Sequence, residues 1–166
     1  MSNPAEIVAF LRDVRLFKDI GASDLTALAR SLRERSLRKG QVLFREGEGG
    51  EEMFLVRRGT MIVSKAVTGR VDQVLARFGP GEFFGEMSLF DRSPRSATVQ
   101  ADADVMLLAL DRVHLQQLID VNPRAAAVFF HALVQVFIER LRATGDLVAE
   151  VTRWGLEATG LDPDQR

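Results

Sequence analysis

The sequence predicts a mainly β protein with helices at both ends, in which the strands form an antiparallel sandwich or barrel. Two observations carry this prediction. From residue 36 to residue 110, glycines separate short runs of β-forming residues, a spacing typical of antiparallel all-β folds. On either side of this segment, apolar residues recur instead at three- and four-residue intervals, which indicates amphipathic helices.

The first helical segment covers residues 1–35. Asn3 precedes Pro4, a combination typical of a helix that begins at a proline and has an asparagine N-cap. Ser23 is expected to cap a second helix. The apolar positions of that second helix are Leu25, Leu28, Ala29 and Leu32.

The strands are predicted between residues 36 and 110. In chain order the candidate runs are QVLFRE, EMFLVRR, TMIVSKAV, VDQVLARF, SATVQA and VMLLAL. Residues 102–104 (DAD) separate the last two runs, and we expect them to form the last hairpin turn. A calcium loop is disfavoured there because its glycine and distal glutamate are missing.

Helices resume over residues 111–154. Asp111 is expected to cap a helix that runs to about Asp120, and residues 122–123 (NP) to open a longer one that ends near Trp154. The longer helix carries a 3-4-3-4-3 seam typical of a coiled coil. The seam residues are Val134, Phe137, Leu141, Thr144, Val148 and Val151. Residues 155–166 are expected to form a frayed tail.

Length and composition limit the function classes. The 166 residues suit one domain, residues 1–154, plus the tail. A net charge of −1 gives no global attraction to nucleic acid or to an anionic membrane. The absence of cysteine excludes disulfides and thiol chemistry. The longest apolar stretch, residues 125–138, is shorter than the roughly 20 residues of a membrane span, and no signal-peptide pattern is present, so we expect a cytoplasmic protein.

The sequence gives little support for an enzyme active site or a cofactor site. Residues 79–85 (GPGEFFG) resemble a dinucleotide-binding glycine motif, but the last gap is three residues instead of two and a strand-to-helix context is missing. His114 and His131 both fall in predicted helices, which disfavours a metal or haem site inside the barrel and a serine–histidine–acid triad. We therefore expect a protein that is not an enzyme and has no cofactor or metal.

The stretch GEMSLFDRSPRSATV, residues 85–99, predicts a local anion site. Its first residues are expected to begin a short helix, whose free N–H groups can bind phosphate. Arg95 offers a two-pronged donor for phosphate oxygens, whereas Glu86 can accept from a sugar hydroxyl. A simple ion pair between Arg95 and Glu86 remains the alternative.

The run FGEMSLFDRSPRSATV resembles the phosphate-binding cassette, here residues 84–98, of cyclic-nucleotide-binding domains. These include the bacterial catabolite activator protein and the regulatory subunit of cAMP-dependent kinase. GQVLFREGEGGEEMFLVRRG is similar to the early strands of the same family. The resemblance implies an eight-stranded antiparallel jelly-roll barrel with N-terminal helices and a long C-terminal helix. The bound ligand would be cAMP or cGMP.

The resemblance also implies roles for individual residues. A ribose–phosphate cradle would be formed by Gly85, Glu86, Met87 and Ser88. Within it, Glu86 would hold the 2′-hydroxyl. Arg95 and Ser96 would bind the cyclic phosphate, and Leu75 would line the apolar side of the pocket.

The C-terminal helix extends the resemblance through the run ERLRATGDLV, which implies that Arg140 and Thr144 lie near the base. This placement favours cAMP over cGMP. The activator has a second hydroxyl directly after the threonine, where this chain has Gly145, so base selectivity stays open.

The expected partners follow from the same resemblance. Transcription factors of the family continue into a helix-turn-helix, whereas this sequence ends after the long helix, so we expect no DNA-binding domain in this chain. We expect a cyclic-nucleotide sensor that forms a homodimer through the C-terminal helix and signals to an effector protein in trans. The alternatives are a degenerate domain that only assembles proteins, and the excised sensor of a larger transcription factor, channel or kinase.

Overall fold

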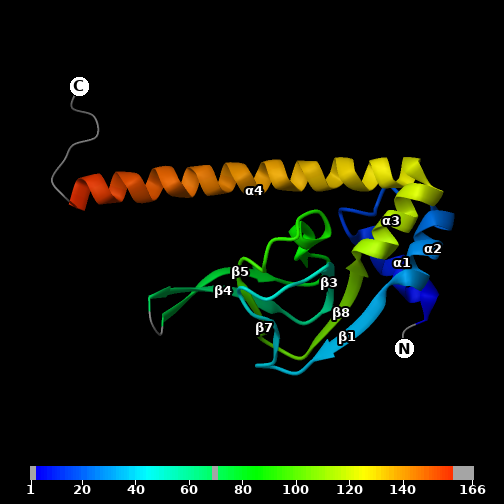
Figure 1. Cartoon of the computed structure of the whole chain (residues 1–166), viewed down its shortest axis with the longest axis horizontal. Helices are drawn as coiled ribbons and strands as arrows, with labels where there is room; N and C mark the ends of the chain where they lie inside the picture. The colour runs from blue at the N-terminus through cyan, green and yellow to red at the C-terminus, as the bar shows by residue number, and fades with distance from the viewer. Residues whose placement is uncertain (1–2, 69–70, 159–166) are drawn as a thin grey trace.

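The computed structural model describes residues 3–68 and 71–158, and it places helices before and after a set of eight strands (Figure 1). The N-terminal helices are α1 (Pro4–Asp13) and α2 (Ala22–Ser31). The strands are β1 (Arg33–Leu37), β2 (Val42–Phe44), β3 (Glu52–Arg58), β4 (Met61–Thr68), β5 (Val71–Phe78), β6 (Phe83–Phe84), β7 (Thr98–Ala101) and β8 (Val105–Asp111). The helices α3 (Arg112–Val121) and α4 (Pro123–Ala158) follow. The predicted fold class is confirmed.

The strands form two four-stranded antiparallel sheets, in the orders β1-β8-β3-β6 and β2-β7-β4-β5. Neighbouring strands within each sheet are mostly distant in sequence, as in a jelly roll. Helices α1, α2 and α3 gather at one end of the barrel, and α4 runs along its side toward the β4–β5 hairpin (Figure 1). In the described part of the chain, none of the helices is both long and apolar enough to cross a membrane.

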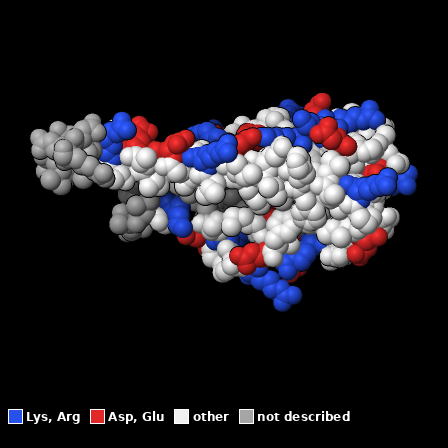
Figure 2. Space-filling view, turned by 90° about the horizontal axis from the view of Figure 1, so that it is seen from above, with Lys and Arg blue, Asp and Glu red and all other residues white. Residues whose placement is uncertain are grey.

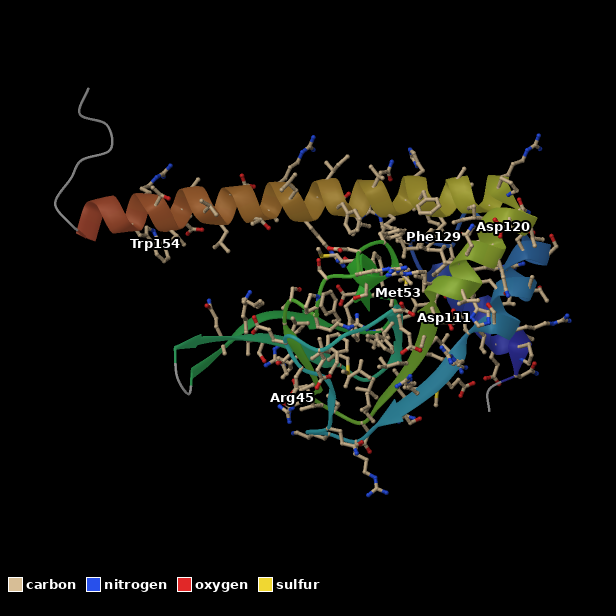
Figure 3. All side chains as sticks on the ribbon, viewed as in Figure 1. Arg45, Met53, Asp111, Asp120, Phe129 and Trp154 are labelled. Carbon is tan, nitrogen blue, oxygen red and sulfur yellow. The ribbon has the colours of Figure 1, made fainter. Side chains whose placement is uncertain are left out.

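Strands β3 and β8 are buried on both faces, which explains why their sequences are continuous apolar runs. In β3, Phe54 and Val56 belong to the core between the sheets, while Met53 and Leu55 pack with the helices. Phe129 of α4 belongs to this second core, and Figure 3 shows it above Met53. The sheet β1-β8-β3-β6 therefore packs on the barrel interior with one face and on the helices with the other.

The N-terminal boundary differs from the prediction. Asn3 caps α1 as expected, because its side chain accepts a hydrogen bond from the Ala5 N–H at 3.0 Å. The prediction for Ser23 is wrong: Gly21 is the N-cap, and Ser23 lies inside α2. Strand β1 also begins at Arg33, within the segment expected to be helical, and pairs with β8 as an edge strand.

The prediction of a hairpin turn at residues 102–104 is also wrong. These residues connect β7 to β8, which belong to different sheets, so the chain crosses from one sheet to the other there. Two carboxylates of this crossing are tied to other loops and strands. Asp104 accepts from the Lys39 N–H at 2.9 Å, and Asp102 pairs with Arg77 of β5.

Both C-terminal helices begin at the predicted caps. Asp111 accepts from the His114 N–H at 2.9 Å, and Asn122 accepts from the Ala125 N–H at 3.1 Å. Helix α4 continues to Ala158, four residues beyond Trp154, so the expected tail begins as helix. Residues 159–166 of that tail lie outside the described residues.

The cap at Asp111 should make stability depend on pH. Burial alone would raise the pKa of Asp111, but hydrogen bonds from the His114 N–H and ring, with the charges of His114 and Arg33, outweigh it and lower this pKa. A lowered folded-state pKa stabilises the protein above the ordinary value of about 4, and this contribution is lost as the pH falls through the folded-state pKa.

We expect Asp111→Asn to be less stable than the wild type at pH 7, with the difference shrinking as the pH falls below about 4. Asparagine is also a good N-cap, so the substitution removes the charge and keeps the cap. Urea unfolding across this pH range measures the effect. A stability difference that is the same at every pH would show that the carboxylate charge contributes nothing.

Helix α4 has one face on the barrel and one in solvent. Leu133 and Val136 are buried, and Phe137 packs against the same core, so Phe137 is not part of the free face expected from the seam. Among the residues of α4 whose side chains the structure describes, the large apolar ones that are exposed are Val134, Ile138, Leu141, Leu147, Val148, Val151 and Trp154. Thr144 is also exposed. Figure 2 shows charged residues along one side of the projecting part of the helix and uncharged residues beside them.

Candidate ligand-binding site

A cavity of about 230 Å³ opens between the second sheet, the segment from Gly85 to Ala97 and helix α4. Its apolar lining residues include Phe44, Val63, Phe78, Phe84 and Val99. The lining also includes the polar residues Glu86, Ser88, Arg95, Ser96 and Arg140. A mainly apolar cavity with a few charged groups suits a small ligand that has both apolar and charged parts.

The segment that follows β6 forms a short 3-10 helix, η1 (Glu86–Leu89), whose N-cap Gly85 is left-handed with φ of 75°. A side chain at position 85 would also bring its Cβ to 2.8 Å from Arg95 Nη1 and 3.2 Å from the Glu52 carbonyl oxygen. Gly85 therefore serves both the turn and the close approach of Arg95.

Arg95 is a buried cation whose hydrogen bonds go to neutral oxygens. Only 7% of the residue is exposed. Nη1 donates to Ser88 Oγ at 2.8 Å and to the Gly85 carbonyl at 3.4 Å, and Nη2 donates to the Glu52 carbonyl at 3.0 Å. Burial lowers the pKa of Arg95, and the charge of Glu52 opposes this shift.

The Arg95 guanidinium is closely surrounded by other protein groups. Its Nε is buried without a hydrogen-bond partner, and the Phe44 ring lies 4.1 Å from Cζ. Because desolvating a charge is costly unless it is compensated, a guanidinium at the wall of a cavity with neutral partners favours an anion.

Glu86 pairs with α4 and not with Arg95. Its Oε1 accepts from Arg140 Nη1 at 2.6 Å, and Arg140 Nη2 donates to the Phe83 carbonyl at 3.1 Å. The Glu86 side chain is 6% exposed and that of Arg140 39%. The simple Arg95–Glu86 ion pair, the alternative explanation of this segment, is therefore absent from the structure, and the two charged groups of the cassette remain separately placed at the cavity.

Seven of the predicted site residues line the cavity: Gly85, Glu86, Met87, Ser88, Arg95, Ser96 and Arg140. Thr144 and Leu75 are not among its lining residues. Thr144 lies one turn beyond Arg140, is exposed, and donates to the Arg140 carbonyl at 2.9 Å. Leu75 is 53% exposed on β5, while Phe78 of the same strand lines the cavity instead.

A break in register explains the position of Leu75. Val63 of β4 pairs with Ala76, but the next residue, Ser64, pairs with Val74, so Leu75 is the extra residue of a bulge. A bulge shifts the alternation of side chains between the two faces of a strand. The alternation of residues along the sequence therefore does not show on which face of β5 the Leu75 side chain lies.

Two contributors were missed by the sequence analysis. Phe44 of β2 packs on the Arg95 guanidinium, as described above. Arg112, the first residue of α3, donates through Nη2 to the carbonyl oxygens of Ser88 at 2.8 Å and Asp91 at 3.2 Å. Arg112 thus holds the end of η1 against α3. Its only sequence signal was its place directly after a helix cap, which is not specific.

The sequence profile of the family described as "Cyclic nucleotide-binding domain" matches residues 34–122, which is more than half of the chain. The chain belongs to the family of cyclic nucleotide-binding domains. The matched segment includes every strand from β2 to β8, the cassette and α3. The family predicted from the cassette motif is confirmed.

Relatives of this family cover most of the chain. A cyclic nucleotide-gated potassium channel of Mesorhizobium japonicum is 41% identical over 70% of this chain and 31% of its own. The cyclic AMP receptor protein of Thermus thermophilus is 34% identical over 76% of this chain and 57% of its own. The chain thus spans about a third of the first protein and just over half of the second.

Solved structures agree with the fold. A cyclic nucleotide-binding domain from Methylobacillus flagellatus superposes with a TM-score of 0.77 at 26% identity, covering 89% of this chain and 83% of its own. The catabolite activator protein of Thermus thermophilus gives a TM-score of 0.73 at 30% identity, covering 90% of this chain and 73% of its own. The jelly-roll architecture with a long C-terminal helix is confirmed.

Proposed function

We propose that this chain is a regulatory module that binds a purine 3′,5′-cyclic nucleotide, with cAMP favoured over cGMP, in the cavity between the cassette and α4. The observation that carries the proposal is the buried Arg95 guanidinium at the cavity wall, whose hydrogen bonds go to neutral oxygens. The family match and the names of the relatives support the same ligand class.

The cavity suggests how the parts of the nucleotide would be bound. Arg95, with the hydroxyls of Ser88 and Ser96, would meet the cyclic phosphate, and Glu86 would accept from the ribose 2′-hydroxyl. The apolar lining residues Val63 and Phe78 would face the hydrophobic parts of the ligand, while Phe44 packs on the Arg95 guanidinium. These groups bind and orient, and we propose no catalytic step for them.

The Glu86–Arg140 pair suggests how binding would reach α4. A carboxylate offers about four acceptor positions, so Glu86 can keep Arg140 and accept the ribose hydroxyl as well. A ligand that fixes Glu86 would then favour the arrangement in which α4 lies on the barrel. This is a population shift, driven by differential binding to two helix positions.

The output of the module is proposed from the same elements. We expect two chains to associate through the exposed face of α4 and an effector protein to respond to the position of that helix. The effector acts in trans or is part of a longer chain. A cytoplasmic location stays a prediction.

The role of Glu86 gives a direct test of this function. We expect 2′-deoxy-cAMP to bind the wild type about tenfold or more weakly than cAMP, because a hydrogen bond to a charged group contributes about 1.5–3 kcal/mol. In Glu86→Ala the two ligands should bind about equally, since the mutant lacks the acceptor that distinguishes them.

Titration calorimetry with both ligands on both proteins measures this coupling. Ser96→Ala is the matched control: it changes another cavity residue, on the phosphate side, and should keep the full deoxy penalty. An equal deoxy penalty in the wild type and in Glu86→Ala would mean that Glu86 does not bind the ribose.

A further inference from the structure

Gly50 lies in the loop between β2 and β3, and the space where its side chain would be is occupied by Arg95. A Cβ at position 50 would lie 2.3 Å from Arg95 Nε, 2.4 Å from Nη2 and 2.5 Å from Cζ. Each distance is well below van der Waals contact. Any side chain at this position would require the guanidinium or the loop to move.

The need for glycine at position 50 comes from space and not from backbone conformation. In the described part of the chain, the glycines with positive φ are Gly40, Gly47, Gly59, Gly81 and Gly85, and Gly50 is not among them. Its neighbour Gly49 also lacks a positive φ, and a Cβ there would meet no atom within 4 Å. Of the two adjacent glycines, a side chain would meet the cation only at Gly50.

The guanidinium has little room to adjust in place. Ser88 Oγ and the Glu52 carbonyl hold its two terminal nitrogens, and the Phe44 ring lies 4.1 Å from Cζ. The group is nevertheless the far end of a flexible side chain, so it can rotate away more easily than the loop can move. A methyl group at position 50 would therefore displace the guanidinium and leave the fold in place.

We propose that Gly50 is a positioning residue for anion binding: the absence of a side chain there lets the Arg95 guanidinium occupy its place at the cavity wall, between Phe44, Ser88 and the Glu52 carbonyl. The binding part of this inference rests on the proposed function, because it takes the cyclic phosphate as the anion. The structural part, the position of Arg95 itself, does not depend on any ligand.

The test compares the wild type with Gly49→Ala, Gly50→Ala, Arg95→Ala and the double variant Gly50→Ala/Arg95→Ala. Titration with cAMP should show wild-type affinity for Gly49→Ala and a loss of tenfold or more for Gly50→Ala. The double variant should bind no worse than Arg95→Ala alone, because both substitutions remove the same contact. A merely structural role for Gly50 would instead add its loss to that of Arg95→Ala.

A crystal structure of ligand-free Gly50→Ala supplies the second measurement. The inference expects Arg95 Nη1 to have left Ser88 Oγ, with the strands of both sheets unchanged. It is overturned if the guanidinium keeps its hydrogen bonds to Ser88 and Glu52, or if Gly50→Ala binds cAMP within twofold of the wild type. If the wild type itself does not bind cAMP, the proposed function fails and this crystal structure alone decides the role of Gly50.

Discussion

Arg95→Ala should bind cAMP at least tenfold more weakly than the wild type while remaining folded. Arg95 is 7% exposed and its guanidinium donates to neutral oxygens, so its charge is available to a phosphate in a place where water screens it poorly. Charge-assisted hydrogen bonds contribute about 1.5–3 kcal/mol, which corresponds to a loss of about 10- to 100-fold in affinity.

Arg92→Ala is the matched control for this substitution. Arg92 belongs to the same loop and carries the same charge, but it is exposed and is not among the residues that line the cavity. Calorimetric titration of all three proteins should leave Arg92→Ala near the wild type. If a folded Arg95→Ala protein bound cAMP with wild-type affinity, Arg95 would not be the phosphate ligand.

Replacing both Leu141 and Val148 with glutamate should convert a dimer into a folded monomer. The two side chains are 73% and 60% exposed and lie two helical turns apart on the free face of α4. Exposed apolar residues in such a continuous row typically mark a contact surface. Two carboxylates on a self-paired face would meet their copies in the partner, and burying unpaired charges is costly.

The helix provides its own control. Ala143→Glu, together with the native Glu150, puts two carboxylates on α4 with the same seven-residue spacing, but each is two positions beyond Leu141 or Val148 and so on the far side of the helix. Light scattering should show a dimer for the wild type and for this control, and half that mass for the double variant. A wild type that is already monomeric at high micromolar concentration would contradict the predicted dimer.

The sequence was most informative where a structural feature depends on residues that are close together in the chain. The caps Asn3, Asp111 and Asn122 begin their helices as predicted, because capping is a local property of the chain. Strand β1, with the sequence RERSL, was missed because an exposed edge strand shows no apolar alternation. The crossing at residues 102–104 looks like a hairpin turn, since the sheet to which each strand belongs is set by long-range pairing.

The site residues also differ in how well the sequence predicts them. The cassette is one continuous segment, so its motif predicted Glu86, Ser88, Arg95 and Ser96, all of which line the cavity. The contributions of Phe44, Gly50 and Arg112 depend on segments that meet only in the folded chain. Leu75 is exposed at a bulge of β5, which the sequence of that strand does not reveal, and its predicted contact with a ligand stays a prediction.

Binding of cAMP to the wild-type protein, with adenosine as the comparison, tests the central claim most directly. Adenosine has the same base and ribose but no phosphate, so it cannot use Arg95. We expect titration calorimetry to show one cAMP bound per chain and adenosine bound at least tenfold more weakly. Equal affinities for the two ligands, or no saturable binding of cAMP or cGMP at millimolar concentration, would contradict the account and favour a domain that only assembles proteins.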